Sequence, residues 1–76
     1  MDIKVFIDNI IDQFDEAPSS GLVAESVLRD IDGWSSIVAL SIMAMIDEEY
    51  DVQIKAEEMR NSKTVQDLFD TVQKYL

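Results

Sequence analysis

The sequence predicts an all-α fold, a small antiparallel four-helix bundle in which one helix is short. Its 76 residues are enough for one modest core and too few for two. Apolar residues recur at helical spacing in separate stretches, with turn-forming residues between them. The chain has no cysteine, so helix packing has to stabilise it without disulfides. We therefore expect a single domain over residues 1–76.

The first predicted helix covers residues 2–16, DIKVFIDNIIDQFDE. Asp2 is its candidate N-cap. Its apolar stripe consists of Ile3, Phe6, Ile7, Ile10, Ile11 and Phe14. The segment APSSG at 17–21 should end the helix, because Pro, Ser and Gly favour turns. Residues 22–33 are less regular, and there we expect a long loop with one helical turn that ends at Gly33.

The second predicted helix runs from about Ser36 to Tyr50, with Ser35 as its N-cap. At about 100° per residue, one side forms a core stripe of Ala39, Ile42, Met43, Ile46 and Tyr50. The opposite side carries Ile37, Leu40, Ser41, Ala44, Asp47 and Glu48, with Val38 and Met45 on the flank between the two sides. A helix that is apolar on two sides must be buried on both or must contact a partner.

The rest of the chain predicts one short helix and one longer helix. The DVQI segment at 51–54 alternates like a strand but has no second strand to pair with, so we expect a connector. KAEEMRN at 55–61 suits a short helix. Ser62 or Thr64 then begins a last helix, whose apolar stripe is Val65, Leu68, Phe69, Val72 and Tyr75.

The charge of the chain limits its partners. It contains 16 Asp and Glu against 6 Lys and Arg, for a formal net charge of -10. Because phosphate binding needs clustered cations, we expect no nucleic-acid partner. We expect a basic protein surface instead, with association steered by charge and weakened by salt.

Composition also argues against an enzyme. Serine and cysteine hydrolases need an imidazole or an equivalent base, and zinc enzymes usually use His ligands. The chain has no His and no Cys. We predict no catalytic residues and no metal site, so that another molecule supplies any chemistry.

The sequence shows no targeting or membrane signal. No apolar run reaches the length that would span a bilayer, and MDIKVFIDN lacks the basic-then-apolar layout of a signal peptide. We expect a cytoplasmic monomer. We also expect it to be free-standing, because it begins at Met1 and ends directly after its last helix.

Acidic residues crowd the end of the second helix. Asp47, Glu48 and Glu49 lie where the helix dipole disfavours negative charge by roughly 0.3–1 kcal/mol each. One interpretation is a solvated face that improves solubility. The other is a docking surface, in which Ile37 and Leu40 are apolar anchors and the acids meet cations on a partner.

Ser36 lies in the first turn of the second helix, near free backbone N–H groups. A phosphate ester at this place would be stabilised by those N–H groups and by the positive end of the helix dipole. Serine before a helix is also a common cap. The residues alone leave both interpretations open.

GWSSI followed by EEYDVQI resembles the acyl carrier proteins, and the resemblance covers essentially the whole chain. The family pattern is Gly, a variable residue, Asp-Ser-Leu, and then a helix that ends in acidic residues, an aromatic residue and an Asp. Gly33 matches the Gly, Ser36 the modified serine and Ile37 the Leu, while residues 48–51 match the ending.

By this resemblance, Ser36 would carry a covalent 4'-phosphopantetheine arm that a phosphopantetheinyl transferase donates from coenzyme A. The arm's thiol would hold an acyl group as a thioester. Its partners would be acyl-loading and acyl-transfer enzymes with basic docking patches, in fatty-acid, polyketide or related biosynthesis. Ile37, Leu40, Asp47, Glu48 and Trp34 would contact these partners. Arg29 is a further candidate for a place beside the arm.

The chain departs from the family pattern at Ser35, where the family usually has Asp, and at Val38 and Ser41, which are often acidic in fatty-acid carriers. These departures indicate a carrier for partners other than the standard fatty-acid enzymes. For the acyl chain, one option is a cleft between helices lined by Met43, Met45, Ile46, Leu68 and Phe69. Ordinary core packing of the same residues is the other.

Three alternatives concern function. DIDG suggests a calcium loop, but with Asp30 and Asp32 in register the first and last ligand positions fall on Leu28 and Ala39, which supply no ligand. An aminoacyl or peptidyl carrier would share every feature of an acyl carrier except its cargo. An unmodified carrier-like adaptor would use the same apolar and acidic face without a reactive Ser36.

Overall fold

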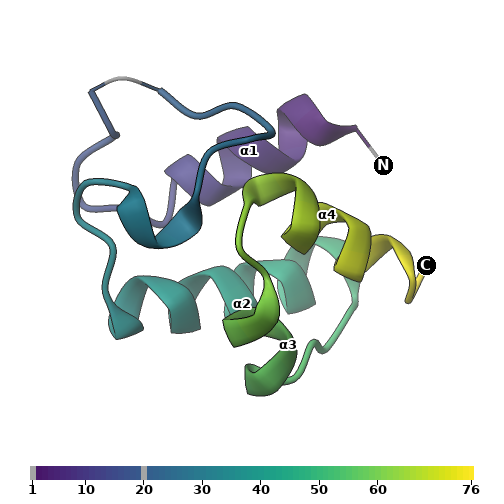
Figure 1. Cartoon of the computed structure of the whole chain (residues 1–76). Coiled ribbons are helices and arrows are strands. Elements are labelled where there is room, and N and C mark those ends of the chain that lie inside the picture. The colour runs from purple at the N-terminus through teal and green to yellow at the C-terminus, as the bar shows by residue number, and fades with distance from the viewer. Residues whose placement is uncertain (1, 20) are drawn as a thin grey trace.

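The computed structural model describes residues 2–19 and 21–76. It is all-helical, with α1 over Ile3–Ile11, a 3₁₀ turn η1 over Leu28–Asp30, α2 over Ser36–Tyr50, α3 over Ala56–Asn61 and α4 over Val65–Gln73. Helices α1 and α2 run antiparallel. The long connection between them crosses to the start of α4 before it returns to the end of the molecule where α2 begins (Figure 1). This arrangement confirms the predicted bundle with one short helix.

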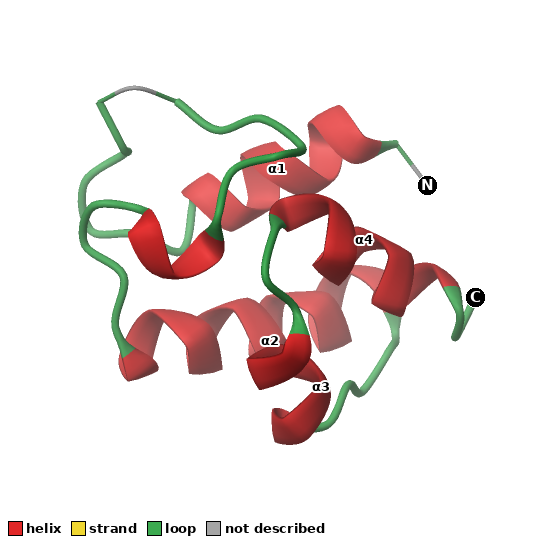
Figure 2. Cartoon of the chain, viewed as in Figure 1, coloured by secondary structure: helices red, strands yellow, loops and turns green. Residues whose placement is uncertain are grey.

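The elements of the described residues are helices and loops (Figure 2). An isolated antiparallel bridge joins Val27 to Thr64. Around it, the Leu28 N–H donates to the Lys63 carbonyl at 2.9 Å and the Val65 N–H to the Ser26 carbonyl at 3.0 Å. The sequence did not predict this pairing, which fixes the loop before α2 against the α3–α4 connection.

Among the described residues, sixteen apolar side chains form one core. Its most buried members include Phe6, Ile10, Ile42, Ile46, Leu68 and Val72. Phe6 packs against Phe69, with ring centroids 5.4 Å apart, and against Tyr50, at 5.8 Å. Aromatic pairs in such tilted arrangements are worth about 0.5–1.5 kcal/mol beyond their burial. These contacts join α1, α2 and α4.

Helix α1 ends at Ile11, and the prediction that it continues to residue 16 is wrong. The N–H groups of Gln13 and Phe14 donate to the carbonyls three residues earlier, at 3.0 and 3.1 Å, so the chain leaves the helix in a tighter turn. Phe14 then packs against Trp34, with ring centroids 6.4 Å apart. Ending early also keeps Asp15 and Glu16 out of the last helical turn, where negative charge is disfavoured. Of the predicted turn at 17–21, Ser20 lies outside the described residues.

The buried side of α2 is rotated relative to the predicted stripe. Val38 and Met45, which we placed on the flank, are buried with Ile42 and Ile46. Ala39, Met43 and Tyr50 are only partly buried. The spacing of the residues in α2 predicts a buried stripe, but the exact side that is buried depends on the tertiary packing of the whole chain.

The C-terminal part agrees with the prediction except at Tyr75. Val52 and Ile54 are buried on either side of exposed Gln53, as expected for an extended connector. Thr64 caps α4 by accepting from the Asp67 N–H at 3.1 Å. Tyr75 lies beyond the end of α4 with 48% of its surface exposed, so its place in the core stripe was wrong.

No helix among residues 2–19 and 21–76 has both the length and the apolar character needed to cross a membrane.

Candidate functional site

Two adjacent serines begin α2, and they have different environments. Ser35 is extended, and its hydroxyl accepts from the Val38 N–H at 3.2 Å, so it is the N-cap. Its carbonyl accepts the first helical hydrogen bond, from Ala39, at 3.0 Å. Ser36 is the first helical residue and is exposed. Both serines are exposed, and they differ in that the Ser35 hydroxyl makes the cap.

A tight turn places these serines. Gly33 has φ +87°, a conformation that a residue with a Cβ rarely adopts. An added Cβ would lie 3.6 Å from Cδ2 of Phe14. The Trp34 N–H donates to the Ile31 carbonyl at 3.0 Å, and the Trp34 ring is partly buried against the core. The turn is therefore held by Phe14 beside Gly33 and by the hydrogen bond and packing of Trp34, and these contacts fix where α2 begins.

The first turn of α2 favours an anion. It contains no acidic side chain, and the N–H groups of a first helical turn have no partner within the helix. The helix dipole adds the equivalent of about half a positive charge at this end. A phosphate ester on the Ser36 oxygen would thus lie beside free N–H groups and the positive end of the helix dipole.

The outer face of α2 displays the predicted contact residues. Ile37 is 76% exposed and Leu40 is 63% exposed, so these apolar side chains point to solvent. Asp47 and Glu48 are exposed near the other end of the helix. At 1.5 Å per residue, Asp47 lies about 17 Å along the axis from Ser36. The face therefore has an apolar half beside Ser36 and an acidic half farther away.

The two other predicted residues are less available. Trp34 lies between the core and the surface, as described above. Arg29 donates from a guanidinium nitrogen to the Arg60 carbonyl at 2.8 Å, which ties η1 to the end of α3. The structure thus brings Ile37 and Leu40 close to Ser36, whereas Arg29 is engaged at α3.

A groove of about 530 Å³ lies beside the start of α2. Two segments line it, the turn after α1 and the start of α2, through Gln13, Phe14, Asp15, Glu16, Ala17, Pro18, Ser19, Asp32, Gly33, Ser35, Ile37, Val38 and Ser41. Sequence reasoning missed this groove because it extended α1 to residue 16. The acidic pair Asp15 and Glu16 before Pro18 was the signal for an earlier helix end.

The cleft suggested for an acyl chain is filled by side chains. Met45, Ile46, Leu68 and Phe69 are all buried members of the core, and Met43 packs partly buried against it. Of the two options for these residues, ordinary core packing agrees with the structure.

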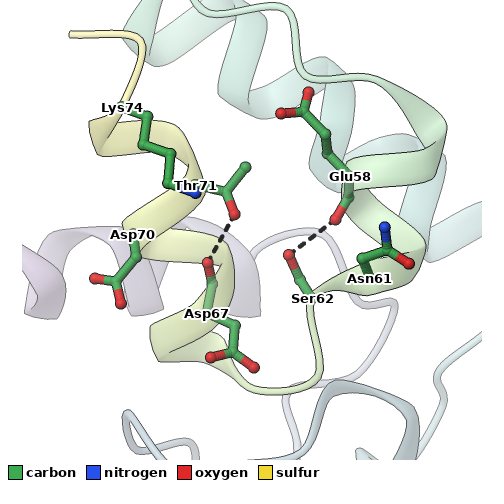
Figure 3. Close-up of a pocket in the computed structure, with 7 residues that line it drawn as sticks. All are labelled: Glu58, Asn61, Ser62, Asp67, Asp70, Thr71 and Lys74. Atoms are coloured by element: carbon green, nitrogen blue, oxygen red, sulfur yellow. Dashed lines mark hydrogen bonds between the residues drawn. The ribbon is translucent and has the colours of Figure 1, made fainter.

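A second cavity of about 470 Å³ lies between α3 and α4 (Figure 3). Its polar groups serve the helix ends: the Ser62 hydroxyl donates to the Glu58 carbonyl at 3.0 Å, and the Thr71 hydroxyl to the Asp67 carbonyl at 2.9 Å. Hydrogen bonds from the N–H groups of Thr64 and Lys63 lower the pKa of the Asp67 carboxyl. Ser62, Thr71 and Asp67 thus have structural tasks in this cavity.

Metal ligands do not gather in the described part of the chain, where no group of three or more acidic, His or Cys side chains could hold an ion. At the calcium-like segment, Leu28 is buried and Ala39 lies within α2. Neither end of that segment offers an oxygen ligand from its side chain.

A solved structure described as "a putative acyl carrier protein" from Mycobacterium tuberculosis is similar over 97% of this chain and 93% of its own, with a TM-score of 0.71 and 27% sequence identity. No protein-family model and no curated protein matches the chain. The structural similarity confirms the resemblance to the acyl carrier family and the fold, and it supports a carrier role without enzymatic activity.

Proposed function

We propose that this protein is an acyl carrier whose Ser36 bears a 4'-phosphopantetheine arm. The observation that carries the proposal is the division between the two serines: Ser35 caps α2, while Ser36 is exposed on its first turn. Modification of Ser36 would therefore leave the cap intact. The described fold and its similarity to a carrier structure support the same interpretation.

The residues around Ser36 fit the arm. Its hydroxyl oxygen would form the phosphodiester, and the first-turn N–H groups and helix dipole would stabilise the negative charge. When attached, the arm supplies a thiol that holds an acyl group as a thioester, which this chain, without Cys, cannot supply itself. The chain's own task is to hold the arm and present it.

The outer face of α2 would be the surface that partners contact. Ile37 and Leu40 would be the apolar anchors, because both are largely exposed beside Ser36. Asp47 and Glu48 would meet cations on the partner, and Trp34 would border the contact. Charge complementarity of this kind mainly raises association rates and selects partners.

The partners in this proposal are a phosphopantetheinyl transferase with coenzyme A, and acyl-loading and acyl-transfer enzymes of fatty-acid, polyketide or related biosynthesis. The protein would act as a cytoplasmic monomer. An aminoacyl or peptidyl carrier would use the same serine and the same arm, so it differs only in the enzyme that loads it.

Intact mass tests the proposal. The protein, first shown to be unmodified, is incubated with coenzyme A and a promiscuous phosphopantetheinyl transferase, and peptides are then mapped. We expect the mass of one phosphopantetheine on the peptide containing Ser36, and no gain in Ser36→Ala. Loading of the Ser36→Ala variant would move the site to Ser35. No gain in the wild type would indicate an unmodified adaptor.

A further inference from the structure

An aromatic pair holds the turn before α2 and joins it to the end of α1. Phe14 lies just beyond α1, and its ring centroid is 6.4 Å from that of Trp34. Phe14 is 8% exposed, and Trp34 packs partly buried against the core. A Cβ added at Gly33 would lie 3.6 Å from Cδ2 of Phe14. Phe14 therefore lies against two successive residues of the turn, and we call Phe14 and Trp34 the aromatic brace.

The aromatic brace is close to the proposed attachment site. Trp34 lies two residues before Ser36 in the chain, and Phe14, Gly33 and Ser35 line the same groove. Ser36 is the first residue of α2, so the helix holds it from one side only. Its position therefore depends on the turn before it as well as on the helix.

The position of Ser36 is important because loading is a displacement at phosphorus. The Ser36 oxygen forms a bond to the phosphorus of coenzyme A that carries the pantetheine. The bond from this phosphorus to the bridging oxygen of the pyrophosphate breaks, adenosine 3',5'-bisphosphate leaves, and the serine proton goes to a base of the transferase. The attacking and leaving oxygens lie roughly in line in such a step, and a misplacement of about 1 Å can slow catalysis by about 100-fold.

We infer that Phe14 and Trp34 are positioning residues for the loading of Ser36, through which the end of α1 sets the place of the attachment site. The inference rests on the proposed attachment at Ser36 and adds residues that act through it. Because Phe14 is 8% exposed, its side chain contributes little to a partner contact. Loss of this ring should therefore slow the reaction within the complex and leave docking almost unchanged.

The test uses Phe14→Leu, with Phe69→Leu as its matched control. Phe69 is 7% exposed and pairs with Phe6 at 5.4 Å, but it belongs to α4. Single-turnover loading is followed by intact mass, with coenzyme A and a promiscuous phosphopantetheinyl transferase in excess over the carrier. We expect Phe14→Leu to lower the rate at saturating transferase by about tenfold, with the half-saturating transferase concentration unchanged. We expect Phe69→Leu to change neither quantity, and equal saturating rates of the two variants would overturn the inference.

The saturating rate separates positioning from loss of stability. At saturating transferase, binding draws unfolded carrier into the complex, so instability alone does not lower this rate. Trp34 is the chain's only tryptophan, and its fluorescence therefore reports on the turn. We expect Phe14→Leu to shift the emission to the red and to increase quenching by acrylamide, with the far-UV circular dichroism of the wild type. Unchanged emission and quenching in Phe14→Leu would show that Phe14 does not hold the turn.

Two changes at Trp34 test whether the two rings act as one unit. Trp34→Leu should lower the saturating rate as Phe14→Leu does, and the double variant should be no slower than either single variant, because effects within one unit are not additive. Trp34→Phe keeps an aromatic ring and should retain most of the rate. If the two single effects multiply in the double variant, the rings do not form a shared brace.

Mass and rate distinguish two kinds of failure. If the wild type accepts no arm at Ser36, the proposed function is wrong, and the positioning role falls with it. If the wild type is loaded and Phe14→Leu is loaded at the same saturating rate, the carrier proposal stands and the positioning role is wrong.

Discussion

Ser35 and Ser36 show how adjacent residues of the same type can have separate tasks. The Ser35 hydroxyl accepts from the Val38 N–H, and the first turn of α2 begins with Ser36. The backbone decides this division, because only the extended residue before the helix can reach back to the free N–H groups. We therefore expect Ser35 to contribute to the stability of the fold and Ser36 to be the residue that is modified.

We predict opposite results for the two alanine variants. Ser35→Ala loses the cap, and we expect its free energy of unfolding to fall by about 1 kcal/mol while Ser36 is still loaded. For Ser36→Ala we expect a change within about 0.5 kcal/mol, as for most surface substitutions, together with loss of loading. Urea unfolding followed by far-UV circular dichroism, and intact mass, measure the two effects. An equal loss of stability in both variants would mean that the serines share the cap.

The helices α2, α3 and α4 begin and end close to where local signals predict. Ser35 is the N-cap of α2 as expected, and Thr64, one of two candidates, is the N-cap of α4; the hydroxyls of both accept from main-chain N–H groups of the first turn. Such signals are local, since a cap and an apolar stripe lie within a few residues of each other in the sequence. The helix order and the place of Ser36 in the first turn of α2 could therefore be predicted from sequence alone.

The end of α1, the buried side of α2 and the groove could not be predicted in the same way. Phe14 continues the helical spacing of α1, yet it packs against Trp34, a residue of the following connection. Val38 and Met45 are buried although they lie on the flank of the stripe that the spacing predicts. Tertiary packing overrides local periodicity at these places. The groove exists because α1 ends at Ile11. The prediction that α1 continues to residue 16 therefore missed the groove.

The ends of α3 and α4 depend on carboxylates. Asp67 accepts from the N–H groups of Thr64 and Lys63 at 3.1 Å each, and these hydrogen bonds lower its pKa. Glu58 accepts from the Lys55 N–H at 2.9 Å and from the Tyr75 hydroxyl at 2.6 Å, which lower its pKa as well. The ionised form of each carboxyl is thus the one that the fold stabilises.

We predict that acid weakens the start of α4 through Asp67. Because its pKa is lower in the folded chain, the contribution is complete above the ordinary carboxyl range and is lost as pH falls through the folded-state pKa. Urea unfolding of the wild type and Asp67→Asn across this range measures it. We expect the wild type to be more stable at neutral pH and the difference to shrink in acid. A difference that is independent of pH would contradict the assignment to the ionised cap.

The acidic half of α2 can be tested apart from its apolar half. We predict that Asp47→Lys with Glu48→Lys raises the KM of a phosphopantetheinyl transferase for this carrier at low salt and less so at high salt. We expect the free energy of unfolding to be unchanged or slightly higher, because cationic side chains are favourable near a helix C-terminus. As a control, Asp8→Lys with Glu25→Lys makes the same charge change at exposed positions outside α2. Equal effects of both variants on KM would contradict the proposal that Asp47 and Glu48 contact partners.

Charge has two opposite consequences for the whole molecule. A net charge of -10 on 76 residues attracts basic partners over distances comparable to the Debye length. The acidic side chains also repel one another in the compact state. Salt screens both interactions. The same addition of salt should thus weaken partner encounter and strengthen the fold.

We predict that the midpoint of thermal unfolding at neutral pH rises from low to high NaCl, because screening reduces repulsion more in the compact folded chain than in the expanded unfolded one. Circular dichroism melts in NaCl and in KCl measure this effect, and equal shifts in both salts would assign it to ionic strength and not to a bound ion. Over the same salt range, the rate of loading by the transferase should fall. If the midpoint stays constant while loading slows, repulsion between the acidic side chains does not measurably destabilise the folded chain. The high negative charge would then affect the encounter with partners alone.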